Sequence, residues 1–517
     1  MQSCFCLNRS LDLASLKQMK NSFTAAKRHS TGVEGLDNIL GGGLPENRLY
    51  LLQAEPGSGK TTLALQFLLE GAKKGETGLY VTLSETRDEL MAVAESHGWN
   101  LDSIVLLELS AINEQLGEAG ENTFFHPSEL ELNKTINVLL AEVERVKPRR
   151  IALDSLSEFR LLAESPLRYR RQILKLKQYF AGRHSTLLLL DDRSGQDTDL
   201  HVESIAHGVI TMQRMPVTYG IQRRCLQVNK LRGVKFREGT HDYLIKKGGL
   251  SVFPRLIASE HGKDFKQEPI ASGIKSFDDL MGGGLDRGTS NLFIGPAGAG
   301  KSTLAMQHLV SAAERGENSV IFSFDESTKT MQTRAASLGM PIMKLMEAGR
   351  IVVKQIDPAE LSSGEFSDYI RCAVEKTDAR AIMIDSLNGY LNSMPDEKFL
   401  SLQLHELLTY LRQQGVVSIM TVAQHGLVGT MQTPVDVTYL ADTVIMLRYF
   451  ETHGSIKKAV SVIKKRSGFH EETIRELKMD AKGIHIGEPL NEFQGVLTGV
   501  PAFKGKEEEN FAHVAQK

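Results

Sequence analysis

Two short segments of the sequence have the residue types and spacing that bind nucleotide phosphates. The segment AEPGSGKTT covers Ala54–Thr62, and GPAGAGKST covers Gly295–Thr303, 241 residues further along. Glycines let backbone N–H groups turn toward phosphate oxygens, the lysine reaches the β- and γ-phosphates, and the next hydroxyl residue binds Mg²⁺. The sequence therefore predicts two phosphate-binding loops that hold ATP and Mg²⁺.

The two loops differ at the first glycine of the pattern. Gly295 keeps this glycine, whereas Ala54 stands at the same place in the first loop. A methyl group at the end of a strand is compatible with the turn, so we expect both loops to bind nucleotide. The loop residues expected to contact ATP are Gly57, Ser58, Gly59, Lys60, Thr61, Thr62, Gly298, Ala299, Gly300, Lys301, Ser302 and Thr303.

Aspartates close a buried apolar segment in both halves of the chain. IALD ends at Asp154, and IMID ends at Asp385. An aspartate at the end of a strand beside the phosphate loop is the expected second anchor for Mg²⁺, together with the hydroxyl of Thr61 or Ser302. The recurrence of the pattern in both halves favours this interpretation over a chance strand end.

Further carboxylates follow the strand-like segments GLYVTL and SVIFSF. Glu85 stands in LSET, and Asp325 and Glu326 stand in FDES, with 241 residues between the two glutamates. A carboxylate in this place can orient or deprotonate the group that attacks the γ-phosphate, so all three are candidate catalytic residues. The alternative is a helix-capping carboxylate without a catalytic role.

A basic pair recurs late in each half. NKLRG contains Lys230 and Arg232, and KKRSG contains Lys464 and Arg466. Both pairs lie far along the chain from their own phosphate loop, so they could contact ATP held by a neighbouring subunit and stabilise its charge. Solvated surface charge is the alternative.

The segments that must position these residues alternate between strand-like and helical patterns. In the first half, Leu49–Ala54, Gly78–Leu83, Arg150–Asp154 and Ser185–Asp192 are apolar runs typical of buried strands. Glu129–Val146 and Pro166–Phe180 instead have apolar residues at helical spacing, and the second half repeats the order. Apolar strands separated by helices indicate a mostly parallel sheet with helices on both faces, an α/β fold.

The recurring order divides the chain into two copies of one domain. We expect the copies at residues 30–257 and 270–501, with residues 258–269 as a polar linker. Residues 1–29 are expected to form an N-terminal extension, and residues 502–517 a short charged tail.

The composition is that of an ordinary globular protein. A net charge of −2 gives no support to bulk attraction toward nucleic acids or membranes. Cys4, Cys6, Cys225 and Cys372 have no spacing typical of a disulfide framework or a zinc site. No apolar run reaches the ~18 residues of a membrane-spanning helix, and residues 1–30 lack the apolar core of a signal peptide. We therefore expect a cytoplasmic protein.

The motifs STGVEGLDNILGGGLP and NKLRG, the paired loops and the acidic residues resemble the KaiC family of circadian-clock ATPases and autokinases. The resemblance extends from Ser30 to about Lys504. It implies tandem RecA-like domains, stacked as two rings in a homohexamer with ATP at the subunit interfaces. It also implies that the first ring is chiefly an ATPase, that the second phosphorylates itself on serine or threonine, and that a KaiB-like or other regulatory protein is a partner.

The family's two adjacent phosphorylated residues correspond here to Thr438 and Tyr439 in DVTYLADT. The family usually has Ser-Thr at this place. We expect Thr438 to be the acceptor and Tyr439 to be a poor one, because the phenol oxygen lies much farther from the backbone. The first copy has Glu203 and Ser204 here, in keeping with a ring that is not modified. A purely structural hydroxyl is the alternative role for Thr438.

Two other functions remain possible from the sequence. A DNA-dependent ATPase of the RecA/RadA type has the same fold, but the near-neutral charge and the lack of a basic–aromatic stripe make nucleic-acid binding the weaker interpretation. A nucleotide-gated scaffold without kinase activity is the other alternative. It is kept open by Ser84, because the family tends to have glutamate at that place.

Overall fold

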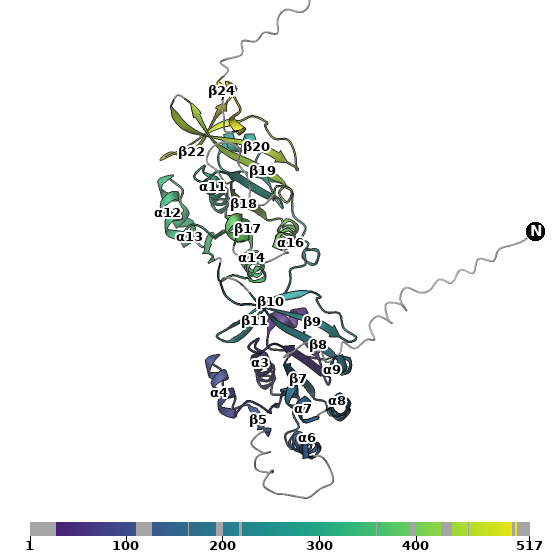
Figure 1. The fold of residues 1–517 in the computed structure, drawn as a ribbon. Helices are drawn as coiled ribbons and strands as arrows, with labels where there is room; N and C mark the ends of the chain where they lie inside the picture. Colours follow the sequence, from purple (N-terminus) through teal and green to yellow (C-terminus); the bar gives the residue numbers. More distant parts are fainter. Residues whose placement is uncertain are drawn as a thin grey trace, which may run out of the picture. The chain divides into compact units, whose positions relative to one another are not determined.

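The computed structural model describes residues 27–109, 127–163, 165–192, 200–216, 220–357, 359–392, 400–424, 437–452, 454–498 and 502–503. The chain divides into two compact units, one formed by Met1–Met215 with Arg224–Pro254 and the other by Pro216–Arg223 with Arg255–Lys517. Each unit is built on a sheet of nine described strands with flanking helices (Figure 1). This confirms the predicted fold of two tandem RecA-like α/β domains. Cys4, Cys6 and most of the expected extension and tail lie outside the described residues.

The main sheet of the first unit has the strand order β11-β10-β9-β8-β3-β7-β6-β4-β5. Strands β8, β3, β7, β6, β4 and β5 pair in parallel, and β9, β10 and β11 pair antiparallel. The strands are β3 (Leu49–Ala54), β4 (Gly78–Thr82), β5 (Ile104–Glu108), β6 (Arg150–Asp154), β7 (Thr186–Asp192), β8 (Gly208–Met215), β9 (Arg223–Leu231), β10 (Thr240–Lys246) and β11 (Gly249–Phe253), besides the small pair β1 (Arg28–His29) and β2 (Leu44–Pro45). The helices are α2 (Glu34–Ile39), α3 (Lys60–Lys73), α4 (Arg87–Ser96), α6 (Pro127–Val146), α7 (Leu156–Ala163), α8 (Pro166–Ala181) and α9 (Leu200–Ile205).

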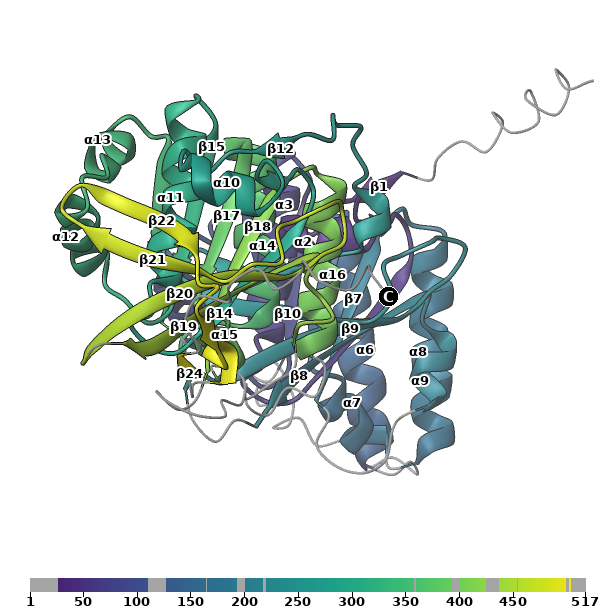
Figure 2. The same cartoon turned by 90° about the horizontal axis from the view of Figure 1, so that it is seen from above.

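The second unit repeats this topology, with the order β16-β15-β17-β18-β14-β19-β20-β21-β22. Figure 2 shows β20, β21 and β22 running together at one edge of this sheet. The strands are β14 (Ser290–Gly295), β15 (Asn318–Ser323), β16 (Ile351–Gln355), β17 (Ala379–Asp385), β18 (Val417–Ala423), β19 (Thr443–Thr452), β20 (Ser455–Lys465), β21 (Arg475–Asp480) and β22 (Gly483–Pro489), besides β12 (Pro269–Ile270), β13 (Leu285–Asp286), β23 (Phe493–Gln494) and β24 (Ala502–Phe503). The helices are α10 (Lys275–Leu280), α11 (Lys301–Glu314), α12 (Thr328–Ser337), α13 (Ile342–Glu347), α14 (Ser363–Thr377), α15 (Leu387–Asn392) and α16 (Leu400–Gln413), with short 3₁₀ turns η1 (Ala258–Glu260) and η2 (Val496–Thr498).

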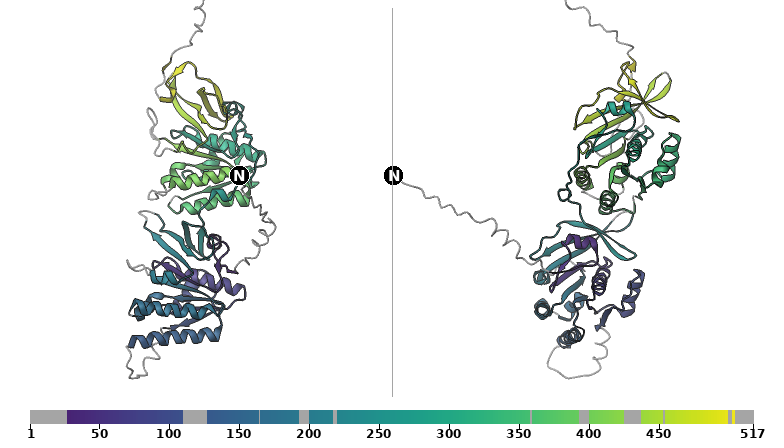
Figure 3. Two further views of the ribbon diagram at one scale, coloured as in Figure 1. Left: turned by 90° about the vertical axis from the view of Figure 1, so that its right-hand side faces the viewer. Right: turned by 180° about the vertical axis from the view of Figure 1, so that it is seen from behind.

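Each sheet is covered by helices on both faces (Figure 3). Successive residues of β3 alternate between two cores, because side chains of a strand point to opposite faces. Tyr50 and Leu52 pack with α3 and α4, whereas Leu49 and Leu51 pack with α6, α7 and α8. Burial on both faces explains why the central strands read as continuous apolar runs. It also holds the carboxyl ends of the parallel strands at one edge, where the candidate residues lie.

Among the described helices, none is both long enough and apolar enough to span a bilayer. Of the cysteines in the described part of the chain, Cys225 and Cys372 are free thiols.

Candidate active sites

Both predicted phosphate loops connect the carboxyl end of a central parallel strand to the N-terminus of a buried helix. The first follows β3 and opens α3 at Lys60, and the second follows β14 and opens α11 at Lys301. The residues before the lysines, Gly59 and Gly300, have φ angles of 92° and 105°. L-amino acids with a side chain rarely adopt these positive φ angles, so the backbone conformation favours glycine at both positions. Free N–H groups at such a helix N-terminus bind phosphate oxygens.

The departure at Ala54 is accommodated in the fold. Ala54 is fully buried at the end of β3 and pairs with Asp192 on β7 and Met212 on β8. In the second repeat, a Cβ at Gly295 would lie only 2.3 Å from the carbonyl oxygen of Leu447. The second repeat therefore has no room for a Cβ at this position, whereas the first buries the methyl group of Ala54.

A tyrosine from the sheet contacts the phosphate loop in each repeat. The hydroxyl of Tyr243 on β10 donates to the carbonyl of Ser58 at 2.7 Å. The hydroxyl of Tyr449 on β19 donates to the carbonyl of Ala297 at 3.1 Å. A Cβ at Gly298 would lie 2.8 Å from the Tyr449 hydroxyl oxygen. These contacts hold the backbone of each loop against its sheet.

The predicted Mg²⁺ ligands come together in both repeats. Thr61 Oγ1 lies 3.2 Å from Asp154 Oδ2, and Ser302 Oγ lies 2.9 Å from Asp385 Oδ1. Both aspartates are buried, which raises their pKa above the ordinary value. A hydroxyl oxygen beside a carboxylate oxygen is a hard-oxygen pair, the donor type that Mg²⁺ prefers. The residues present therefore fit Mg²⁺ in both sites.

The two loop lysines have different partners. Lys60 Nζ forms an ion pair with Asp192 at the end of β7. Lys301 Nζ instead donates to the carbonyl of Pro296 at 2.8 Å, and burial lowers the pKa of Lys301 to about 8. Sequence reasoning missed Asp192, although the acidic end of the apolar run STLLLLDD was a signal for it.

Short turns after β4 and β15 position the candidate catalytic glutamates. In the first, Thr82 Oγ1 accepts from Glu85 N at 2.9 Å and donates to the carbonyl of Glu85 at 2.8 Å. Ser323 makes the same two contacts with Glu326, at 3.3 and 2.7 Å. The next residue caps the following helix, through the Thr86 side chain at α4 and the Ser327 side chain at α12. Side-chain hydrogen bonds thus set the same turn in both repeats.

Glu85 points into the first nucleotide site. Its Oε1 lies 3.4 Å from Thr61 Oγ1, and its buried Oε2 has no hydrogen-bond partner among the described residues. Burial and the nearby charge of Asp154 raise the pKa of Glu85 to about 7. This carboxylate has a free oxygen beside the candidate Mg²⁺ ligands, as a general base requires.

The acidic pair of the second repeat is held differently. Glu326 forms a two-point ion pair with Arg334, at 2.6 Å between Oε2 and Nη2 and 3.2 Å between Oε1 and Nε. Arg334 Nη1 also donates to Thr303 Oγ1 at 2.7 Å. Asp325 accepts a hydrogen bond from Ser386 at 2.5 Å. Sequence reasoning missed Arg334, because an arginine within a helix carries no pattern of its own.

The basic pairs lie against the segment that corresponds to the phosphorylated residues of the family. In the second repeat, Lys464 Nζ donates to the carbonyl of Thr438 at 2.9 Å, and Arg466 Nη2 donates to that of Tyr439 at 3.0 Å. Thr438 is partly buried, whereas Tyr439 is 56% exposed. Two separate sequence signals, the basic pair and the acceptor segment, therefore meet in one place.

The first repeat has the same arrangement without the threonine. Lys230 Nζ donates to the carbonyl of Glu203 at 2.7 Å, and Arg232 Nη2 donates to that of Ser204 at 2.7 Å. The basic pairs therefore make the same backbone contacts in both repeats. The side chains of the contacted segment differ, with Glu203 and Ser204 in the first repeat and Thr438 and Tyr439 in the second.

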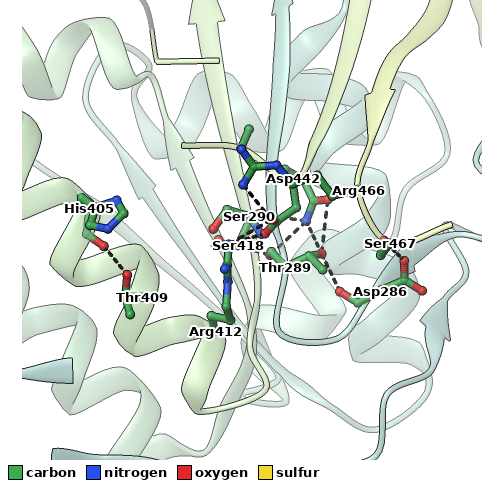
Figure 4. Close-up of polar contacts among 12 residues, drawn as sticks. Asp286, Thr289, Ser290, His405, Thr409, Arg412, Ser418, Asp442, Arg466 and Ser467 are labelled. Carbon is green, nitrogen blue, oxygen red and sulfur yellow. Dashed lines mark hydrogen bonds and ion pairs between the residues drawn. The ribbon is translucent and has the colours of Figure 1, made fainter. Parts of the chain in front are cut away.

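Figure 4 shows Arg412 and Arg466 converging on the buried carboxylate of Asp442. Arg412 Nη2 lies 2.9 and 2.8 Å from the two carboxylate oxygens, and Arg466 Nη1 lies 3.6 Å from Oδ1. Ser290 N at the start of β14 also donates to Asp442 at 3.0 Å. The side chain of Arg466 is still 51% exposed, so its guanidinium is anchored at one end and open to solvent.

Two phosphate loops on parallel α/β sheets, each with a hydroxyl–carboxylate pair, define a tandem ATPase of the RecA-like class. A family model described as "ATPase: KaiC" matches residues 29–257 and 270–491. The chain belongs to the KaiC family.

Curated relatives match along almost the whole chain. The "Circadian clock oscillator protein KaiC" of Thermosynechococcus vestitus is 25% identical over 491 residues, which cover 93% of each chain. The protein of the same name from Nostoc sp. is 26% identical over 494 residues, or 94% of each chain. "Circadian clock protein KaiC3" of Synechocystis sp. is 25% identical over 483 residues, or 92% of this chain and 95% of that protein.

Proposed function

We propose that this KaiC-like ATPase hydrolyses ATP in its first repeat and phosphorylates itself on Thr438 in its second. The proposal rests on one difference between the repeats: their basic pairs make the same backbone contacts, but only the second repeat has a threonine in the contacted segment. Both have a phosphate loop beside a hydroxyl–carboxylate pair and a basic pair bound to the acceptor segment, but Glu203 stands in the first repeat where the second has Thr438. The relatives are named as circadian clock proteins, and we assign this chain to regulation of that kind.

At the first site, Lys60 and the loop N–H groups hold the phosphates, and Thr61 and Asp154 would hold Mg²⁺. The metal would neutralise negative charge on the phosphates. Glu85 orients a water molecule and takes its proton as the water oxygen bonds to the γ-phosphorus. The bond from the γ-phosphorus to the bridging oxygen breaks, and its electron pair leaves with ADP.

At the second site, the attacking group is the Thr438 hydroxyl of a neighbouring subunit in a homohexamer. Asp325 or Glu326 accepts the hydroxyl proton, the threonine oxygen bonds to the γ-phosphorus, and ADP leaves with the electron pair of the broken bond. Lys301 holds the phosphates, and Ser302 and Asp385 would hold Mg²⁺. Since Lys464 and Arg466 are bound to the acceptor segment, the hydroxyl and the two cations approach the same nucleotide together.

The two loop lysines separate these activities experimentally. Lys60→Ala should chiefly impair ATP-dependent assembly, measured by light scattering after size exclusion. Lys301→Ala should abolish transfer of label from γ-labelled ATP, because each lysine contacts only the phosphates of its own site. Lys73→Ala, an exposed lysine at the end of α3, is the control. Equal loss of phosphorylation in both loop variants, with assembly intact, would contradict a division of labour.

A further inference from the structure

We propose that Arg334 restrains ATP hydrolysis at the second nucleotide site and so reserves that ATP for transfer to a hydroxyl group. The inference rests on the proposed function and adds a residue that determines which acceptor the site serves. Its starting point is that two equivalent glutamates, Glu85 and Glu326, have different partners.

Arg334 occupies both oxygens of the Glu326 carboxylate. The guanidinium makes two parallel contacts, at 2.6 and 3.2 Å, and both side chains are largely buried, with 25% and 21% of their surfaces exposed. Its third contact, 2.7 Å to the Thr303 hydroxyl, attaches it to the helix that the phosphate loop opens. Arg334 is therefore fixed between α12 and the first turn of α11, with Glu326 locked against it.

The first repeat lacks this restraint. The residue 241 positions before Arg334 is Val93 on α4, which packs against the core beside that helix. Glu85 keeps one oxygen beside Thr61 and the other without a partner among the described residues. One glutamate is therefore available to a water molecule, and the other is engaged.

The contacts of the carboxylate decide its chemistry. To activate water, a carboxylate must hold the water by one oxygen and accept a proton as the oxygen attacks phosphorus. A two-point arginine pair stabilises the charged carboxylate and fills the lone pairs that a water would use. Asp325 accepts a hydrogen bond from the Ser386 hydroxyl and has no arginine partner among the described residues, so this carboxylate remains to accept the proton of Thr438.

The test measures phosphate release from the second site alone, in a Glu85→Gln background that silences the first. Adding Arg334→Val, the residue of the first repeat, should raise the rate about tenfold by freeing a general base. Arg334→Lys keeps the positive charge but removes the two-point guanidinium contact, so it should give a smaller increase in the rate of phosphate release. In a Lys301→Ala background, the reciprocal Val93→Arg should lower release from the first site.

A double variant shows whether the effect passes through Glu326. Glu326→Gln together with Arg334→Val should lose the gain. Unchanged or slower phosphate release in Arg334→Val, with a normal melting temperature and normal binding of a fluorescent ADP analogue, would overturn the inference. If Arg334→Val does not fold, Arg334→Lys and Val93→Arg decide in the same way. If Arg334→Val releases phosphate faster but the unaltered chain acquires no label on Thr438, Arg334 still restrains hydrolysis. That result would refute the kinase proposal instead.

Discussion

Glu85 is the residue on which hydrolysis in the first repeat depends. Glu85→Gln removes the proton acceptor but keeps the size of the side chain and its hydrogen bond to Thr61. We expect ATP hydrolysis by the first site to fall about a hundredfold, in the range typical of a general base, with nucleotide binding retained. Phosphate release by a Lys301→Ala chain, with and without the change, measures this.

The exposed Glu95 on the same helix α4 provides the control, because Glu95→Gln makes the same chemical change away from the site. Hydrolysis that survives Glu85→Gln undiminished would mean that another group activates the water.

At this scale, sequence patterns located the residues that lie in motifs and missed those defined only by folding. The loops, Asp154 and Asp385 could be found because the second copy repeats each signal. Asp192 and Arg334 have no counterpart in the other copy, so comparison of the copies hid them. Ala423 stands at the strand position that matches Asp192, and Val93 stands 241 residues before Arg334. Their contacts exist only after β7 and α12 are packed beside the loops.

Among the elements, helix α11 contains a buried histidine that should lower the stability of the second unit in acid. His308 is buried between Phe277 and Phe293, and neither of its ring nitrogens has a hydrogen-bond partner among the described residues. Burial lowers the pKa of His308 to about 3. The folded state therefore keeps a neutral ring, while an unfolded chain takes up a proton below about pH 6.5. The stability that the folded state gains from keeping this ring neutral is fully present above about pH 6.5, and it is lost as the pH falls toward 3.

We expect His308→Phe to flatten the pH dependence of second-unit stability between about pH 6.5 and 5, by up to ~1.4 kcal/mol per pH unit. The first repeat already has Phe67 at the equivalent place in α3, buried to the same degree. Calorimetric melting at both pH values measures the change, and the exposed His405 provides a His405→Asn control. An undiminished acid shift in His308→Phe would assign the effect to other groups.

The expected elements agree closely with the observed ones where burial is complete. Arg150–Asp154 is β6 as expected, and the expected helix Pro166–Phe180 is α8 with one further residue. The antiparallel strands β9 and β10 were not predicted, because their exposed and buried residues are mixed and give no continuous apolar run. The strands that carry Tyr243 and Lys230 are therefore known from the structure alone, although the basic pairs themselves were predicted from the sequence.

For the whole molecule, the two repeats explain why one chain has two phosphate loops. Equivalent topology places the same parts at both sites, and a few substitutions then separate their chemistry. Val93 and Arg334 distinguish the glutamates, and Glu203 and Thr438 distinguish the acceptor segments. The homohexamer, the cytoplasmic location and a KaiB-like partner stay predictions of this account.

Transfer of phosphate to Thr438 is the central claim, and mapping of label from γ-labelled ATP tests it most directly. The purified chain is incubated with labelled ATP and Mg²⁺, and the modified residue is identified by mass spectrometry. We expect label on Thr438, nearly complete loss in Thr438→Ala and retention of most label in Tyr439→Phe, since positioning of the nucleophile dominates phosphoryl transfer. Phosphotyrosine as the main product, or a chain that hydrolyses ATP without acquiring any label, would contradict the account.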